Sequence, residues 1–313
     1  MDIKKSKIFL AGHKGHVGSA ILRKLKTKGY KRIIIANKKS LNLLDQKKVF
    51  NFLKKHKPKY VIIAAARVGG VNANNTLRGK FIYENLEIQN NIIHGSYLNG
   101  VKNLIFFGSS CIYPANISKP IKEKMLLSGS LEYTNEPYAI AKIAGIKLCE
   151  SYNQQYKTNY KCLMPCNSYG PNDNYNLKTS HFFAALLKKI YLAKKNGKKK
   201  LEIWGSGNPK REVIFVDDIA DACIYFMRKK TKNVLINIGT GWDLSINNFA
   251  KIIMHYLGVK LKIVNNKNMT EGVKRKLLDV GLSKKLGWKY KTSLQEGLDK
   301  TYDDFIKNYH KKN

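Results

Sequence analysis

The stretch that decides the fold lies near the N-terminus and reads KIFLAGHKGHVG at residues 7–18. A short apolar run ends at Gly12, and apolar residues at helical spacing follow from Val17 to Leu25. The glycines are spaced one residue wider than in the commonest dinucleotide fingerprint, so an ordinary glycine-rich turn is the alternative. A strand, this turn and a helix predict a dinucleotide pyrophosphate at the helix N-terminus. The expected cofactor-binding residues are Gly12, His13, Lys14, Gly15, His16, Val17 and Gly18.

Apolar strands alternate with helices through the first half of the chain. The expected strands are 7–11, 33–36, 60–66, 104–107 and 160–164, and the expected helices are 17–25, 46–55, 78–99 and 138–156. This order predicts an α/β protein with a Rossmann-type doubly wound parallel sheet. We expect residues 1–165 to form the dinucleotide-binding domain.

The rhythm changes after Pro165, where loops lengthen around glycine and proline. Apolar runs at 213–216 and 234–238 are expected to return to the main sheet, so segments near 213–240 belong with the first domain. Residues 166–212 and 241–313 are then expected to form a smaller, interleaved C-terminal lobe that binds substrate.

Composition limits the class of protein. With 43% hydrophobic residues the chain is globular, and its formal net charge of +37 comes from lysines scattered throughout it. We interpret this charge as a solvated surface and expect no specific nucleic acid partner. The chain begins without a secretory segment and has no run long enough to span a membrane, which predicts a cytoplasmic protein. Five cysteines without metal-binding spacing indicate reduced thiols and no metal site.

The residues after the second expected strand bear on the choice of cofactor. An NAD-selective site places an acid there, whereas this chain reads ANKKS at residues 36–40. Lys38 and Lys39 follow the strand, and Lys14 in the glycine loop adds a third positive charge. The expected partners of a 2′-phosphate are Lys38 and Lys14. The missing acid and the lysines together predict NADPH.

A tyrosine and a lysine supply candidate chemistry. EPYAIAK at residues 136–142 places Tyr138 and Lys142 on one face of a helix, where the ammonium group is expected to lower the pKa of the phenol. Ser109, in the loop after the fourth strand, could donate a hydrogen bond to the same substrate oxygen. Alone, each motif would be ordinary, because Tyr/Lys pairs occur on solvated helices and Gly-Ser-Ser forms common turns.

Together these stretches resemble the GDP-L-fucose synthase family of extended short-chain dehydrogenases/reductases. The likeness covers nearly the whole chain, and its most specific parts are SSCIYP at 109–114 and RKLLD at 275–279. It implies NADPH-dependent 3,5-epimerisation and 4-reduction of GDP-4-keto-6-deoxy-D-mannose to GDP-L-fucose. It also implies a homodimer, with the helices near 78–99 and 138–156 as possible contact surfaces.

The resemblance also implies roles for individual residues. Tyr138, Lys142 and Ser109 would serve reduction, while Cys111 and His181 would move protons at C3 and C5, with the base at each carbon left open. Without the resemblance, an inert thiol and a capping histidine would be the better interpretations. The implied substrate-binding residues are Lys189, Trp204, Arg211 and Asp279. The implied cofactor contacts are Ser109, Lys142, His181, Pro165, Cys166, Asn167 and Ser168, and the chain departs from the family's usual Pro-Thr-Asn-Leu at Cys166 and Ser168.

Two other functions stay open from the sequence. One is another nucleotide-sugar enzyme, such as a 4-epimerase or a 4,6-dehydratase, which usually has an acid after the second strand. The other is a dinucleotide-sensing regulator without enzymatic activity, which typically lacks the Tyr/Lys pair.

Overall fold

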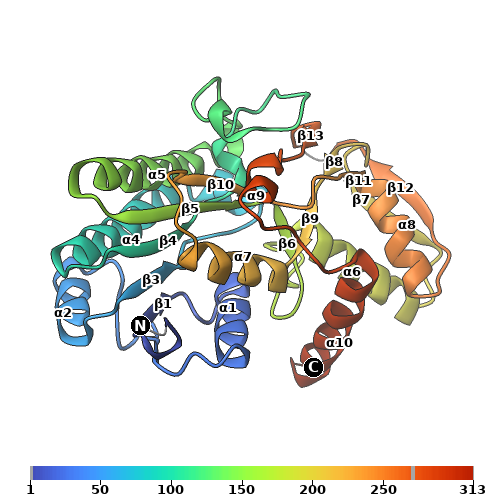
Figure 1. Cartoon of the computed structure of the whole chain (residues 1–313). Helices are drawn as coiled ribbons and strands as arrows, with labels where there is room; N and C mark the ends of the chain where they lie inside the picture. Colours follow the sequence, from blue (N-terminus) through green and yellow to red (C-terminus); the bar gives the residue numbers. More distant parts are fainter. Residues whose placement is uncertain (1–2, 269–271, 313) are drawn as a thin grey trace.

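The computed structural model describes residues 3–268 and 272–312. Its main sheet contains six parallel strands in the order β10-β5-β4-β3-β1-β2 (Figure 1). Their bounds are β1 Ile8–Ala11, β2 Ile33–Ile34, β3 Tyr60–Ile63, β4 Asn103–Phe107, β5 Asn159–Pro165 and β10 Leu235–Ile238. The central strands are nearly continuous apolar runs because helices cover both faces of a parallel sheet. The Rossmann-type α/β fold predicted from the sequence is confirmed.

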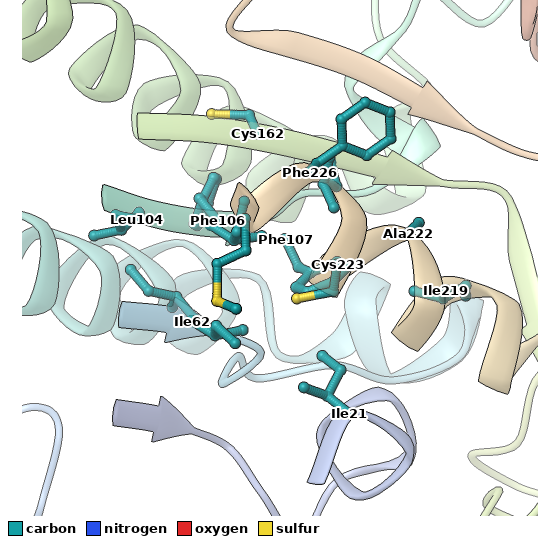
Figure 2. Packing of buried hydrophobic residues seen from close by; sticks show 14 of the residues in the cluster. Ile21, Ile62, Leu104, Phe106, Phe107, Cys162, Ile219, Ala222, Cys223 and Phe226 are labelled. Atoms are coloured by element: carbon teal, nitrogen blue, oxygen red, sulfur yellow. The ribbon is translucent and has the colours of Figure 1, made fainter. Parts of the chain in front are cut away.

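Two groups of helices cover this sheet (Figure 1). One face carries α2 (Gln46–His56), α4 (Arg78–Leu98) and α5 (Glu136–Tyr156), and the other carries α1 (His16–Thr27) and α7 (Val216–Arg228). Figure 2 shows part of the buried cluster, where Cys223 of α7 lies beside Phe107 of β4 and Ile21 of α1 points toward the strands. Each large apolar side chain buried in this way stabilises the fold by about 1.5–3 kcal/mol.

The strand order places the ligand site. From β1 the chain crosses to β2 on one side, then returns to β3 on the other side of β1. Ligands in such sheets bind where the crossing direction reverses, beyond the carboxyl ends of the strands. The loop after β1 and the segment after β3 therefore meet at the expected cofactor site.

The second part of the chain has its own hydrophobic cluster and three small sheets. Its helices are α6 Phe182–Lys195, α8 Ile246–Tyr256 and α10 Leu294–Lys312. Its strands pair as β6 Asn167–Tyr169 with β9 Val213–Phe215, as β7 Lys200–Trp204 with β12 Lys262–Asn266, and as β11 Leu244–Ser245 and β13 Arg275–Lys276 on either side of β8 Lys210–Arg211. The remaining elements are α3 Val71–Thr76, α9 Gly281–Lys285 and the 3-10 helices η1 Ile3–Lys5, η2 Ser110–Ile112, η3 Glu123–Met125 and η4 Tyr133–Asn135.

Only one of the two strands expected to return to the main sheet does so. β10 pairs with β5, but β9 pairs with β6 in a separate two-stranded sheet. Successive side chains of β9 point to opposite faces. Ile214 packs in the first hydrophobic cluster, while Val213 and Phe215 pack in the second. This strand thus joins the two cores instead of extending one of them.

Two predicted strands are shorter than expected. β2 ends at Ile34 and not at Ala36, and β3 ends at Ile63, so that Ala64–Ala66 continue as irregular backbone. Ala64 and Ala66 line the cleft described below, and this placement explains why the apolar run outlasts the strand. In the part of the chain that the structure describes, no helix is both long enough and apolar enough to cross a membrane.

Candidate active site

A cleft of about 450 Å³ is lined by residues from both parts of the chain, each of which has its own hydrophobic cluster. It brings together thirteen of the residues that the sequence suggested. These are Val17, Ser109, Cys111, Tyr138, Lys142, Pro165, Cys166, Asn167, Ser168, His181, Lys189, Trp204 and Arg211. The other suggested residues lie outside its lining, namely Gly12, His13, Lys14, Gly15, His16, Gly18, Lys38, Lys39 and Asp279.

The glycine loop joins β1 to α1, and its backbone lies very close to neighbouring backbone atoms. Gly12 has φ +88°, and a Cβ there would lie 2.6 Å from the backbone nitrogen of Ala65. A Cβ at Gly18 would collide with the carbonyl oxygen of Gly12. Within the described residues no side chain caps the N-terminus of α1, so its first N–H groups can face a diphosphate. The loop therefore fits a dinucleotide.

A turn from the second half holds this loop in place. The Asn172 side chain donates to the carbonyl oxygen of Lys14 at 3.0 Å and to the hydroxyl of Ser19 at 3.1 Å. The His16 ring donates from Nδ1 to the carbonyl of Pro171 at 3.1 Å, and burial lowers the pKa of this imidazole. The position of the glycine loop thus depends on both halves of the chain.

Lys38 and Lys39 lie exposed in the turn after β2. This turn is closed by Ser40, whose backbone N–H donates to Asn37 Oδ1 at 2.9 Å. An acid that the sequence pattern does not reveal approaches from α4, where Glu84 binds Arg67 through Nε at 2.6 Å and Nη2 at 3.0 Å. Hydrogen bonds from Arg67 lower the pKa of Glu84, and the charge of Lys38 adds to this effect. The region keeps a positive balance suited to a 2′-phosphate.

Tyr138 and Lys142 lie on α5 facing the cleft. Lys142 is 2% exposed, and its Nζ donates to the carbonyl of Phe107 at 2.9 Å and lies 5.7 Å from the centre of the Tyr138 ring. Burial lowers the pKa of Lys142 to about 7. Burial, and then the nearby Cys111, raise the pKa of Tyr138. The prediction that the ammonium group lowers the tyrosine pKa is wrong, because desolvation of the buried phenol raises it. Tyr138 is therefore a neutral phenol that can donate a proton.

Ser109 and Cys111 occupy the start of η2, directly after β4. The Ser109 hydroxyl accepts from the backbone N–H of Cys111 at 3.3 Å, which keeps its own O–H available for the cleft. Cys111 is partly exposed, whereas the other four cysteines are buried. Among those four, burial raises the pKa of the Cys166 thiol, so that its side chain is unreactive.

The second half of the chain contributes positive and aromatic groups to the cleft. His181 lies exposed at the residue before α6. Lys189 Nζ contacts the carbonyl of Glu202 at 3.3 Å and lies 5.0 Å from the Trp204 ring centre, and this ring is half exposed. Arg211 donates to the carbonyl of Val273 at 2.8 Å and so holds Val273 in the cleft lining.

The suggested contact of Asp279 with the substrate stays a prediction. Asp279 lies outside the cleft lining, where its Oδ1 accepts from the N–H of Gly281 at 2.7 Å and its Oδ2 lies 3.9 Å from Lys122 Nζ. Lys276, three residues earlier, lines the cleft and donates to Cys111 Sγ at 3.7 Å. The RKLLD stretch contains this lysine, but its spacing does not show which residue faces the ligand.

Three further polar groups at the cleft were not suggested by the sequence. Within the described residues, Asn74 Oδ1, Asn135 Oδ1 and Ser180 Oγ have no hydrogen-bond partner, and all three side chains line the cleft. Such oxygens can accept hydrogen bonds from the hydroxyl groups of a sugar. No motif marks them, because they come from α3, from the turn before α5 and from the turn before α6.

Comparisons with known proteins agree with this geometry. Residues 8–239 match the model of the NAD dependent epimerase/dehydratase family. The chain is 46% identical to GDP-L-fucose synthase 1 of Arabidopsis thaliana, covering 98% of this chain and 95% of that protein. It is 45% identical to GDP-L-fucose synthase of Escherichia coli (strain K12), covering 98% of both. Its structure is similar to that of a GDP-mannoheptose C4 reductase from Campylobacter jejuni with NADP bound, with a TM-score of 0.88, 40% identity and coverage of 98% of this chain and 100% of that chain.

Proposed function

The chain belongs to the NAD dependent epimerase/dehydratase family and, within it, to the GDP-L-fucose synthases, and we propose that it converts GDP-4-keto-6-deoxy-D-mannose to GDP-L-fucose. The reaction combines epimerisation at C3 and C5 with NADPH-dependent reduction at C4. The observation that carries this proposal is the meeting, in one cleft, of Tyr138 and Lys142 with Cys111 and His181. The first pair suits ketone reduction, and the second suits proton exchange beside a ketone.

Reduction uses the groups on α5 and η2. When bound, NADPH supplies the hydride that adds to C4. The C4 oxygen then takes the proton of the Tyr138 phenol, and the ketone becomes a hydroxyl group. Ser109 donates a hydrogen bond to the same oxygen while its negative charge develops. Lys142 lies behind Tyr138 and can return a proton to the phenolate, because its pKa of about 7 lets it exchange protons at neutral pH.

Epimerisation must come before reduction. Protons at C3 and C5 are acidic only while C4 is a ketone, because the charge left by their removal rests on the C4 oxygen. Tyr138 and Ser109 can hydrogen-bond that oxygen in both stages. Cys111 after β4 and His181 before α6 supply the two groups needed to remove a proton from one face and return it to the other.

The GDP part of the substrate is assigned to the groups that the second half of the chain contributes to the cleft. Lys189 and Arg211 carry positive charges suited to the diphosphate, and the exposed face of Trp204 offers a surface for stacking. Asn74 and Asn135 supply free acceptors in the same cleft, which we assign to the hexose.

We also propose a homodimer and a cytoplasmic location. The dimer surface is assigned to α4 and α5, which pack together and expose Tyr83, Leu98 and Ile140. The cytoplasm is supported by five free cysteines, since reduced thiols persist there. Light scattering after gel filtration tests the dimer, and a monomeric mass would contradict it.

The direct test of the activity follows the loss of NADPH absorbance on addition of GDP-4-keto-6-deoxy-D-mannose. We expect rapid oxidation with NADPH, slower oxidation with NADH, and none when the UDP-linked analogue replaces the substrate. No oxidation with the GDP-linked sugar would contradict the proposed function.

One second function has a specific observation in its favour. The structural similarity to a GDP-mannoheptose C4 reductase allows reduction at C4 without epimerisation. Retention of the original C3 and C5 protons in the product would identify this function. The contact of Cys111 with a charged partner favours the epimerising enzyme.

A further inference from the structure

Lys276 contacts the one partly exposed thiol among the described residues. Its Nζ donates to Cys111 Sγ at 3.7 Å, across 165 residues of sequence, and both side chains line the cleft. Hydrogen bonds from an ammonium group to sulfur strengthen when the sulfur is a thiolate. The contact therefore holds the Cys111 sulfur beside a positive group at the cleft wall.

The backbone around Lys276 is held firmly. β13 pairs in parallel with β8, where Lys276 lies opposite Arg211. Two residues later, the N–H of Leu278 donates to the buried carboxylate of Glu212 at 2.8 Å, and the N–H of Ile121 donates to the carbonyl of Leu277 at 2.9 Å. These hydrogen bonds fix the backbone position from which the Lys276 side chain enters the cleft.

We propose that Lys276 is a positioning residue for Cys111. The ammonium group of Lys276 holds the Cys111 sulfur as a thiolate at the cleft wall and prepares it to remove protons beside a ketone. This role rests on the proposed function, in which Cys111 removes protons beside the ketone.

The proton balance is simple. The thiolate takes a proton from the carbon beside the ketone and becomes a thiol, and the C–H electron pair moves into an enolate whose charge rests on the C4 oxygen. His181 returns a proton to the opposite face of that carbon. Exchange with water then restores both side chains.

Other titratable groups line the same cleft as Cys111. Tyr138 and Lys142 come from α5, His181 precedes α6, and Glu132 precedes η4. Glu132 is already engaged, since it accepts hydrogen bonds from Thr134 and Asn135. Lys276 is the positive group whose hydrogen bond to the sulfur the structure places at contact distance.

The test measures alkylation of Cys111 by iodoacetamide as a function of pH, with mass spectrometry to identify the modified thiol. The wild-type protein should react at Cys111 first, because the other four cysteines are buried. In Lys276→Met, alkylation at neutral pH should slow by about tenfold, and the pH of half-maximal rate should rise by about one unit. Equal profiles for the variant and the wild type would overturn the proposal.

Three further variants separate the charge of Lys276 from its size and from its position in the chain. Lys276→Arg keeps the charge and should keep the wild-type profile, whereas Lys276→Gln should behave like Lys276→Met and replaces it if that variant fails to fold. Lys274→Met removes an exposed lysine from the same segment, outside the cleft lining, and should change nothing. An arginine variant with the methionine profile would contradict the proposal.

A second readout uses deuterium uptake at C3 and C5 of GDP-4-keto-6-deoxy-D-mannose. Uptake by Lys276→Met should require a higher pH, by about the same shift as alkylation. A raised KM with an unshifted pH profile would show that Lys276 only binds substrate, which contradicts the proposed role. Alkylation needs no substrate. If the wild-type protein does not react with GDP-4-keto-6-deoxy-D-mannose, the proposed function is refuted, but the alkylation test of Lys276 can still be made.

Discussion

The two chemical pairs of the cleft are built in opposite ways. Tyr138 and Lys142 lie four residues apart on one helix, and their lysine is almost completely buried. Cys111 and Lys276 lie 165 residues apart, and they meet only because β13 of the second half packs beside η2 of the first. A pair on one helix survives any change that leaves the helix folded. A pair joined across two halves depends on how those halves pack, and can be altered separately.

The burial of the two pairs also differs in its consequences. Around α5, burial lowers the pKa of Lys142 and raises that of Tyr138, so both groups favour their neutral forms. At η2, the partly exposed thiol contacts the Lys276 ammonium group, which by our proposal prepares the sulfur to accept a proton. The first pair is thus suited to donating a proton, and the second is suited to accepting one.

The largest expected effect is on reduction, which depends on Tyr138 and Lys142 and not on Cys111 and Lys276. Tyr138→Phe removes the proton donor for the C4 oxygen and should lower the rate of reduction by about 100-fold to 10,000-fold. NADPH binding, followed by its fluorescence, should stay within about twofold of wild type, because the phenylalanine keeps the ring against Phe81. Reduction at more than a tenth of the wild-type rate would show that another group donates the proton.

The converse change acts on the second pair. Cys111→Ser should lower deuterium uptake at C3 and C5 by about 100-fold, because a serine hydroxyl is a much weaker acid than a thiol. The variant should still oxidise NADPH with the GDP-linked ketone, since Tyr138 and Lys142 are unchanged. Unaltered uptake, measured by proton NMR in D₂O, would remove Cys111 from the mechanism.

A smaller effect asks whether cofactor choice depends on local charge. Lys38→Ala should raise the KM for NADPH by about tenfold and leave the KM for NADH nearly unchanged, because one charge-assisted contact to phosphate is lost. Lys26→Ala serves as the matched control, since this exposed lysine lies at the opposite end of α1 from the glycine loop. Equal changes for both cofactors would refute the 2′-phosphate assignment.

The smallest effect concerns stability and follows from the buried amine. Between about pH 7 and the ordinary lysine pKa of 10.5, the unfolded chain binds one proton more than the folded chain, so the free energy of unfolding rises with pH through Lys142. Lys142→Met removes this dependence. It should be more stable than wild type by about 1 kcal/mol near pH 6, after the loss of the bond to Phe107 is included.

The pH dependence of the stability difference tests this prediction further. The advantage of Lys142→Met should shrink and then reverse as pH rises from about 7 toward 10, because wild type gains about 1.4 kcal/mol per pH unit in this range, while the rate of reduction by the variant stays far below that of wild type. Denaturant unfolding at several pH values measures it. A constant difference across this range would mean that the amine is not titrating in the folded protein.

Features encoded by neighbouring residues could be predicted from the sequence. The spacing of Gly12, Gly15 and Gly18 indicated the phosphate-binding turn, and the four-residue spacing of Tyr138 and Lys142 placed both on one helix face. These features need only the local backbone, which apolar periodicity and glycine positions specify.

Features that depend on packing could not be predicted in the same way. The pairing of β9 with β6 requires two hydrophobic clusters, one on each side of the strand. Within RKLLD, the residue that faces the cleft is set by the pairing of β13 with β8, and so Lys276 lines it and Asp279 does not. The raised pKa of Tyr138 arises from burial, which a four-residue spacing does not reveal.

The measurement that tests the central claim most directly is proton NMR of the product formed by the wild-type protein in D₂O. With GDP-4-keto-6-deoxy-D-mannose and NADPH, both pairs acting in one cleft predict GDP-L-fucose with deuterium at C3 and C5, and one NADPH oxidised per product. A reduced sugar that keeps its original C3 and C5 protons and configuration would contradict the account.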